Sequence, residues 1–338
     1  MLSRVAEHLY WFGRYLQRVE NSARLINVNT ILLLDLPRRV RLGWEPLIEI
    51  VGAGGAFTEL YDTPNEENVV RFLSVDVRNP GSMLSSLNAA RENLRTTRDW
   101  VPGDVWEKLN DLYFHVQDQS ERALARSSRH NFLNHVVDGA LRIYGLLVAN
   151  MSHDVGFRCL RLGASLEQAD MTTRIVDARS TRLIRAKSAQ EYGSFDHVEW
   201  MSVLRSLMAY QMYLRHAHNR VSGVPVVRFL LQDREFPRSV MFCLLTIGST
   251  LPHLPPHPDV QRALERTRLV VHDADVERLV TSGLHDLMDD IQKGLGELHE
   301  AISGAFFGGS AEERATESGC PSEDAAPLSF DPASRHDG

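Results

Sequence analysis

The pattern Gly13-Arg-Tyr-Leu-Gln-Arg-Val-Glu-Asn-Ser-Ala-Arg-Leu-Ile26 occurs again, in altered form, as Gly163-Ala-Ser-Leu-Glu-Gln-Ala-Asp-Met-Thr-Thr-Arg-Ile-Val176. Both copies begin with a glycine, have a leucine three residues later, and then an acidic residue followed one helical turn on by an arginine. The offset between the copies is 150 residues throughout. Self-similarity at a fixed offset indicates a duplicated architecture, so we expect two pseudo-repeated halves that begin near residues 1 and 151.

The first copy lies on a stretch with helical periodicity. Residues 1–34 are apolar at every third or fourth position, a spacing that places these side chains on one face of a single helix. Glu20 and Arg24 stand one turn apart at the edge of that face, with the acid first, which favours an ion pair. Asp170 and Arg174 occupy the matching places in the second copy. We therefore expect a half-buried acid–arginine pair in each copy.

Gly13 and Gly163 stand at matching positions inside these two helices. A glycine within a helix costs about 1 kcal/mol relative to alanine. Its presence at both positions suggests that another segment comes very close there, most simply the backbone of a neighbouring helix. We expect the two copies to pack against each other around a pseudo-two-fold axis, with both glycines in a structural role.

A polar stripe runs along the opposite edge of the first helix. It consists of Glu7, Tyr10, Arg14, Gln17, Arg18 and Asn21. The simpler interpretation is a solvated face with local ion pairs, because charged helix faces are usually exposed. The alternative is that the stripe and the two acid–arginine pairs face one polar cleft that binds an anionic ligand or a partner. The candidate cleft residues are Glu7, Tyr10, Arg14, Arg18, Glu20, Arg24, Asp170 and Arg174.

The rest of the chain also shows helical periodicity and almost no two-residue alternation of strand length. We predict an all-α fold, a multi-helix bundle in one domain over residues 1–307. Within it, 195–221 and 275–306 are each expected to form one helix, Gly52-Ala-Gly-Gly55 a loop between helices, and Pro80 the start of a helix. Residues 308–338 have little apolar content, so they cannot offset their own ordering entropy and should form a disordered acidic tail.

Composition limits the possible classes of function. The 338 residues carry a formal charge of −7, but most of that charge lies in the acidic tail and leaves the domain near neutral. A near-neutral domain lacks the basic face that nucleic-acid binding needs. No run near the start is long and apolar enough for a signal core or a membrane span. The three cysteines form no C-x-x-C pair, so we expect a cytoplasmic protein without a disulfide framework.

The sequence lacks the spacings that are typical of a phosphate-binding loop and of a di-metal helical site. The glycine run at 52–55 lacks the Lys-Ser/Thr that follows in a phosphate-binding loop. None of the 14 histidines has an acidic residue three positions before it, as a di-metal helical bundle would require. Cys159 and Cys243 lie in apolar helical contexts and are expected to fill the core. We predict no metal and no cofactor, and the sequence leaves open whether the chain is an enzyme.

These segments resemble a bacterial family of all-helical proteins, the alpha-E family. The opening from Met1 to Arg24 is similar to the start of the family almost residue for residue, and further similar segments follow at Ala90–Asp99, Val105–Tyr113, Ala169–Arg174 and Asp233–Val240. The resemblance covers about residues 1–305. It departs in the second copy, where Ala164 and Gln168 stand in place of the Gly-Arg and Glu-Arg that the family tends to have. An anion site that relied on arginines there would be weaker in this chain.

The resemblance implies association with a circularly permuted ATP-grasp protein similar to carboxylate–amine ligases, and often with a transglutaminase-like protein. The expected function is a non-catalytic helical partner or scaffold in an amide-ligase system that makes or modifies peptides or amide-linked metabolites. Two alternatives stay open. One is an enzyme of that pathway that uses Glu20 or Asp170 as an acid–base group beside arginines, and the other is a sensor of a small anion.

Overall fold

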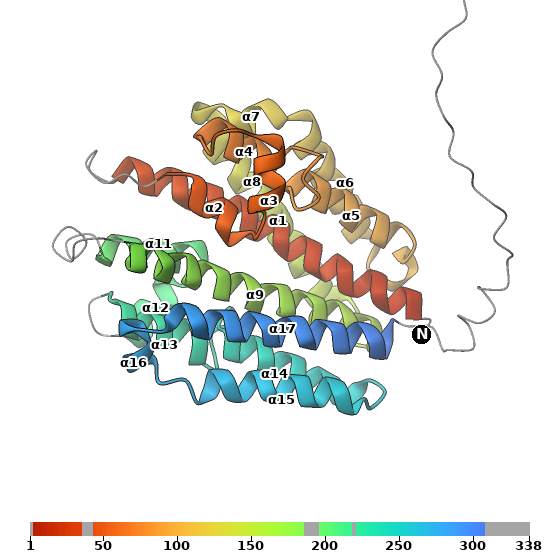
Figure 1. Ribbon diagram of the computed structural model, residues 1–338. Helices are drawn as coiled ribbons and strands as arrows, with labels where there is room; N and C mark the ends of the chain where they lie inside the picture. Colours follow the sequence, from red (N-terminus) through yellow and green to blue (C-terminus); the bar gives the residue numbers. More distant parts are fainter. Residues whose placement is uncertain (1–2, 36–42, 186–195, 218–220, 308–338) are drawn as a thin grey trace, which may run out of the picture. The chain divides into compact units, whose positions relative to one another are not determined.

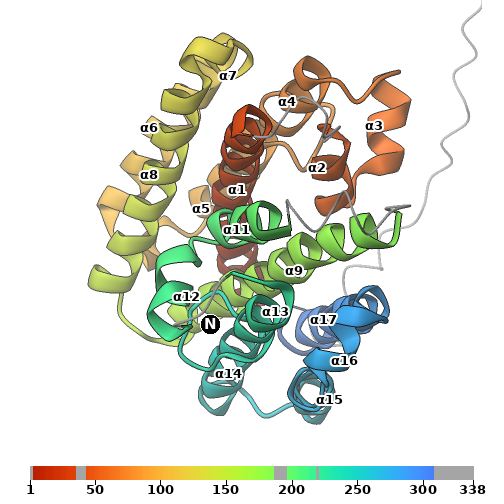
Figure 2. The ribbon, with the colours of Figure 1, turned by 90° about the vertical axis from the view of Figure 1, so that its left-hand side faces the viewer.

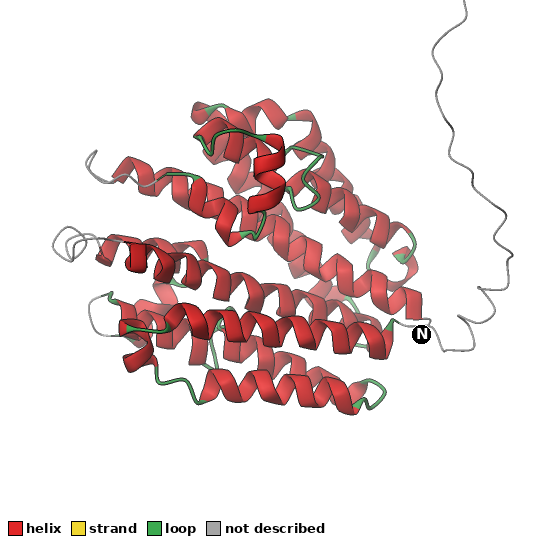
Figure 3. Ribbon diagram, viewed as in Figure 1, coloured by secondary structure: helices red, strands yellow, loops and turns green. Residues whose placement is uncertain are grey.

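The computed structural model describes residues 3–35, 43–185, 196–217 and 221–307, and every regular element in these ranges is a helix (Figure 1, Figure 3). The chain is therefore all-α, as its periodicity predicts. The expected acidic tail lies outside the described residues. In chain order the helices are α1 (Ser3–Asp35), α2 (Glu45–Ile50), α3 (Gly54–Leu60), α4 (Glu66–Ser74), α5 (Met83–Arg95), η1 (Arg98–Trp100), α6 (Gly103–Asp118), α7 (Ser120–Leu124), α8 (Arg126–Asn150), α9 (Val155–Arg185), α11 (Asp196–Ser206), α12 (Tyr210–His216), α13 (Gly223–Gln232), α14 (Val240–Thr250), η2 (Leu251–His253), α15 (Pro258–His272), α16 (Val276–Thr281) and α17 (Leu284–Phe306).

Two long helices, α1 and α9, form the centre of the domain. They pack more extensively against each other than does any other pair of helices, and Figure 2 shows them in the middle of the bundle. The N-terminal helices α5 and α8 pack on α1, and α6 packs on both of them. The C-terminal helices α14 and α17 pack on α9, and both also contact α15. The two central helices thus join the N-terminal and C-terminal groups of helices.

Helix α1 is surrounded by other helices over most of its length. Its apolar face is buried from Leu9 to Ile26, as the spacing predicts, and includes Phe12 and Val19. Its polar side chains Glu20 and Asn21 are buried as well. Because buried polar groups must find hydrogen-bond partners inside the protein, this helix cannot have the fully solvated edge that an ordinary surface helix presents.

Gly13 and Gly163 lie where α1 and α9 cross. A Cβ atom added at Gly13 would clash with the backbone oxygen of Leu160, and one added at Gly163 would clash with the backbone oxygen of Tyr10. Tyr10 and Leu160 are themselves 150 residues apart, so the contact is reciprocal. The expectation that the two copies pack on each other at these glycines is confirmed. The repetition of whole halves stays a prediction.

Two of the expected long helices are interrupted by residues with positive φ. The helix expected over 195–221 forms α11 and α12, since Met208 between them has φ 54° and breaks the run of helical dihedral angles. The helix expected over 275–306 forms α16 and α17, which are separated by Gly283 at φ 102°. Glycine adopts this conformation readily because it has no Cβ atom.

Two predicted boundaries near the centre of the fold are also wrong. Gly54 and Gly55, expected in a loop, are the first residues of α3. Helix α5 begins after Ser82 rather than at Pro80, because the Ser82 side chain accepts a hydrogen bond from the backbone N–H of Ser85 and caps the helix. Asn79 and Gly81 of the preceding turn line a cavity together with residues of α1 and α9.

One helix in the described part of the chain, α8, is long and apolar enough to cross a membrane by length and composition. Its apolar residues Phe132, Leu133, Val136 and Leu147 are buried in the core of the domain, and the helix packs against α1 and α6. A core helix passes the same test of length and composition, so α8 is weak support for a membrane span. The expectation of no membrane partner stays a prediction.

Replacing Gly13 by alanine should destabilise the protein by about 3 kcal/mol or more, because the clashing atom belongs to the backbone of α9 and the two helices would have to separate. Gly296 on α17 is the matched control, since a Cβ atom there would meet nothing within 4 Å. Alanine at Gly296 should stabilise the protein by up to about 1 kcal/mol. Urea denaturation of both variants measures the difference, and equal changes at the two sites would contradict the close crossing.

Candidate functional site

Glu167 links the two copies of the motif through a buried cluster of charges. Its Oε2 accepts a hydrogen bond from Nε of Arg14 and its Oε1 one from Nε of Arg18, each at 2.7 Å. The side chain of Glu167 is 3% exposed and that of Arg14 is 12% exposed. Burial alone would raise the pKa of Glu167, but the charges of Arg18 and Arg14 more than offset burial and hold this pKa below its usual range. Glu167 is therefore ionised at neutral pH.

Aromatic rings support both arginines of this cluster. The guanidinium of Arg14 lies 5.2 Å from the ring centroid of Trp11, and that of Arg18 lies 5.6 Å from the ring centroid of Tyr15. Such cation–π contacts add to the ion pairs and restrict the guanidinium groups to one position. The two arginines are thus held in place from both sides.

Glu20 is the centre of a second buried cluster. Its Oε1 accepts hydrogen bonds from Nε of Arg24 at 2.8 Å and from Nη2 of Arg238 at 2.5 Å. Arg238 also donates to the side-chain oxygen of Asn21 at 3.1 Å. The predicted pair of Glu20 and Arg24 is confirmed. Arg238 reaches the cluster from the turn between α13 and α14.

The second copy has the matching acid–arginine pair, in a more open position. Nε of Arg174 donates to Oδ2 of Asp170 at 2.8 Å, and both side chains are partly exposed. The turn between α2 and α3 passes over this pair at Gly52, which has φ 66° and where an added Cβ atom would lie 2.8 Å from Nη1 of Arg174. A glycine at this position therefore allows the turn to approach the guanidinium.

Four of the eight candidate residues line one cavity of about 240 Å³, which we call the arginine cavity. These four are Arg14, Arg18, Asp170 and Arg174. Together with Glu167, the lining carries three guanidinium groups and two carboxylates. Both copies of the motif contribute, as the cleft hypothesis predicts. The simpler interpretation, a solvated helix face with local ion pairs, is wrong for Arg14 and Arg18, because both pair with a buried carboxylate of α9.

Glu20 instead lines a different cavity, of about 150 Å³, which we call the Gln168 cavity. The residues that form the two cavities correspond through the repeat. Arg14 and Arg18 of the arginine cavity match Ala164 and Gln168 of the Gln168 cavity, and Glu167 and Asp170 match Gln17 and Glu20. The expectation of one shared cleft is therefore wrong, since the close crossing of α1 and α9 leaves space on two sides instead of one.

The remaining candidates, Tyr10, Glu7 and Arg24, line neither of these two cavities. The hydroxyl of Tyr10 lies 2.8 Å from Nδ1 of His299 on α17, and the two rings are stacked. Burial raises the pKa of Tyr10 to about 12. Burial, followed by the charge of Arg14, lowers the pKa of His299. The hydrogen bond therefore joins a neutral phenol to a neutral imidazole. It connects α17 to α1.

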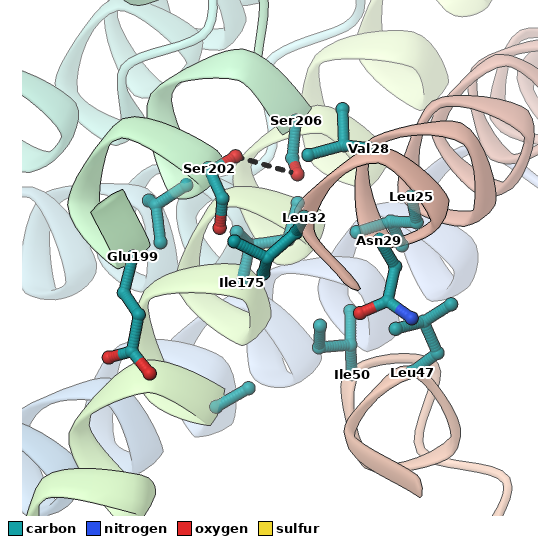
Figure 4. A pocket seen from close by; sticks show the side chains of 12 residues that line it. Leu25, Val28, Asn29, Leu32, Leu47, Ile50, Ile175, Glu199, Ser202 and Ser206 are labelled. Carbon is teal, nitrogen blue, oxygen red and sulfur yellow. Dashed lines mark hydrogen bonds between the residues drawn. The ribbon is translucent and has the colours of Figure 1, made fainter. Parts of the chain in front are cut away.

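A third cavity, of about 50 Å³, lies among α1, α2, α9 and α11 (Figure 4). Its walls are mainly apolar, and the hydroxyl of Ser206 donates to the carbonyl of Ser202 at 3.0 Å. Nδ2 of Asn29 is buried there without a hydrogen-bond partner among the described residues. The volume suits a few water molecules, so we interpret this cavity as a hydration site.

One group of side chains among the described residues has the spacing of metal ligands. Asp177, His285 and Asp289 place ligand atoms within 4.8 Å of one another. Nδ1 of His285 lies 2.7 Å from Oδ1 of Asp177, and this hydrogen bond and the carboxylate charge raise the pKa of His285. Metal binding requires a neutral imidazole, so the raised pKa favours the ion pair of His285 with Asp177. The expectation of no metal stays a prediction.

Sequence reasoning did not identify Glu167, Gln168 or Arg238 as part of the site. A signal for Glu167 exists, since it is an acid one turn after Gly163 at the position that Gln17 has in the first copy. No local signal exists for Arg238, which is separated from Glu20 by 218 residues. Only the packing of α14 against α9 brings it to the crossing.

Comparison with known proteins agrees with the fold. The family model Alpha-E, described as a predicted alpha-helical domain with a conserved ER motif, matches residues 1–307. Similar curated proteins occur in Mycobacterium bovis and in two strains of Mycobacterium tuberculosis, each 23% identical over 325 residues and named uncharacterized. The alignments cover 86% of this chain and 35% of each relative, so the chain spans about a third of their length. No solved structure matches the chain.

Glu167→Gln should destabilise the protein by about 3–5 kcal/mol at pH 7, because it leaves two largely buried guanidinium groups without a counter-charge. The lowered pKa of Glu167 means that its contribution is present above the unfolded-state value near 4.3 and is lost as the pH falls through the folded-state value. The deficit should therefore shrink on acidification. Urea denaturation between pH 3 and pH 8 measures it.

The matched control is Glu265→Gln, which removes an exposed pair with Arg268 on α15. Its denaturation midpoint should stay close to that of the wild type, because exposed pairs contribute little. A Glu167→Gln variant as stable as this control would show that the cluster does not hold α1 and α9 together.

The neutral form of His299 should make stability depend on pH. Because its pKa is lower in the folded protein than in the unfolded chain, its contribution is complete above the unfolded value of about 6.5 and is lost as the pH falls through the folded value. His299→Gln removes the titration and keeps a hydrogen-bonding partner for Tyr10. Denaturation midpoints at pH 5 and pH 8 should differ less in this variant than in the wild type. A difference as large as that of the wild type would assign the pH dependence to other groups.

Proposed function

Because the chain belongs to the Alpha-E family over residues 1–307, we propose that it is a non-catalytic helical partner of an ATP-grasp carboxylate–amine ligase. That system would make or modify peptides or amide-linked metabolites in the cytoplasm, with a transglutaminase-like protein as a second partner. The resemblance of the sequence supplies the identity of these partners. The arrangement of charges at the centre of the fold supports the non-catalytic role.

The observation that carries this role is the pairing of each carboxylate at the crossing of α1 and α9. Glu167 and Glu20 each accept hydrogen bonds from two arginines, and Asp170 accepts one. General acid–base catalysis needs a carboxyl group that can exchange a proton with the substrate, and carboxylates that already accept hydrogen bonds from arginines are poorly placed for that task. These pairs favour a partner role over an enzyme that uses Glu20 or Asp170.

The length of the relatives also supports a partner role. The matched region makes up 35% of each mycobacterial relative, so these chains carry it together with further sequence. Two components that act together gain effective concentration when they are joined in one chain. A domain that forms part of longer chains fits a component that works beside another protein domain.

The test is co-expression of the full chain with the ATP-grasp protein encoded next to its gene. We expect the two proteins to co-purify and co-elute. ATP consumption in the presence of a carboxylate and an amine should be at least several-fold greater for the pair than for the ligase alone. The transglutaminase-like neighbour can be tested in the same way.

Two results would contradict the partner role. One is turnover of an amine or a peptide by the isolated chain, which would make it an enzyme. The other is ATP consumption by the ligase that is unaffected by this chain, with no association of the two proteins. A cooperative thermal unfolding transition, measured on the chain used in each assay, shows that the chain is folded.

A further inference from the structure

The Gln168 cavity differs from the arginine cavity in what fills it. In the arginine cavity, Arg14 and Arg18 extend from α1 and close on Glu167 of α9. In the Gln168 cavity the matching positions carry Ala164 and Gln168, opposite the uncharged Gln17. The space at this side of the crossing, about 150 Å³, is therefore lined at the matching positions by side chains that form no ion pair.

Two arginines at other positions nevertheless place positive charge in the lining of the Gln168 cavity. Arg161 of α9 lines the cavity and forms no ion pair with any described residue. Arg238 also lines it and is paired with Glu20. The lining thus holds two guanidinium groups against one carboxylate. This excess of one positive charge suits a ligand group with one negative charge.

One of the residues that line this cavity has a buried donor without a partner. Gln168 is 5% exposed, and its Nε2 is buried without a hydrogen-bond partner among the residues that the structure describes. Its side chain lines the cavity. Buried polar groups are almost always hydrogen-bonded, and an unpaired one is costly to the fold. Such a donor is expected where a ligand supplies the acceptor.

We propose that the Gln168 cavity binds a small carboxylate. One ligand oxygen accepts a hydrogen bond from Nε2 of Gln168, and the carboxylate pairs with the guanidinium of Arg161. Leu141, Ala164 and Phe242 in the lining offer apolar contact to a short aliphatic part of the ligand. The inference rests on the cavity alone, so it does not require the ligase partnership.

Size and charge define the class of ligand further. The cavity is smaller than the several hundred Å³ typical of sites for drug-sized molecules, which limits the buried part of the ligand to a few carbon atoms. The carboxylate of Glu20 in the lining opposes a compact dianion such as phosphate. Two kinds of ligand present a single carboxylate beside a short aliphatic group, namely a short organic acid and the C-terminus of a peptide.

Calorimetric titration of the full chain tests the proposal and separates the two sources. The probes are propionate, succinate and trialanine, with trialanine amide and inorganic phosphate as comparisons. We expect saturable binding of at least one of the three carboxylates, and no binding of the amide, which lacks the carboxylate. Tighter binding of trialanine than of the free acids would assign the site to a peptide terminus, and the reverse order would assign it to a small acid.

Two variants and one control connect binding to the named residues. Arg161→Ala should weaken binding of the best probe by about ten-fold or more, as expected for loss of a charge-assisted hydrogen bond. Arg142→Ala is the matched control, because Arg142 is exposed on α8 and does not line the cavity. Its affinity for the same probe should equal that of the wild type.

Gln168→Leu separates a binding role from a structural one. Removing a buried unpaired amide should leave the melting temperature unchanged or higher, while binding of the probe is lost. A lower melting temperature with unchanged binding would overturn the assignment of Gln168. The site as a whole is overturned if the wild type binds none of the three carboxylates, if phosphate binds more tightly than all of them, or if Arg161→Ala and Arg142→Ala bind equally.

Discussion

The close crossing of α1 and α9 at Gly13 and Gly163 is the constraint on which the rest of the structure depends. Each glycine lies against the backbone of the other helix, so the two helices approach more closely than side chains would allow. Polar groups of both helices lose access to water at the crossing and must pair with each other. Glu167 does so with Arg14 and Arg18, and the pairing holds the N-terminal and C-terminal groups of helices together.

The crossing also explains why the polar residues divide between two cavities. Helices that touch at a glycine separate on both sides of the contact, and each side receives one set of matching positions from the two copies. The two sides differ in sequence. On one side two arginines of α1 pair with a carboxylate of α9, and on the other the matching positions carry Ala164 and Gln168, which form no ion pair. The same geometry thus supports a charge cluster that stabilises the fold and a cavity with an unused donor.

The charge clusters and the Gln168 cavity have different roles, since the clusters stabilise the fold and the cavity is the proposed binding site. The buried pairs around Glu167 and Glu20 satisfy the charges that the crossing removes from water, which leaves little freedom for proton transfer. The Gln168 cavity has spare positive charge and an unpaired amide. A partner of a carboxylate–amine ligase would meet carboxylates as substrates of that enzyme, so the two proposals are compatible, although each is tested separately.

The sequence by itself determined the all-α fold, the long first helix, the pair of Glu20 with Arg24 and that of Asp170 with Arg174. These features depend on spacing within one helix, because the fixed rise and rotation per residue determine which side chains are neighbours. Only the tertiary structure decided the partners of Glu167, the arrival of Arg238 and the division into two cavities. Helical periodicity likewise did not predict the helix breaks at Met208 and Gly283. Contacts between distant segments depend on how closely helices cross and where turns lead, and no local spacing encodes either.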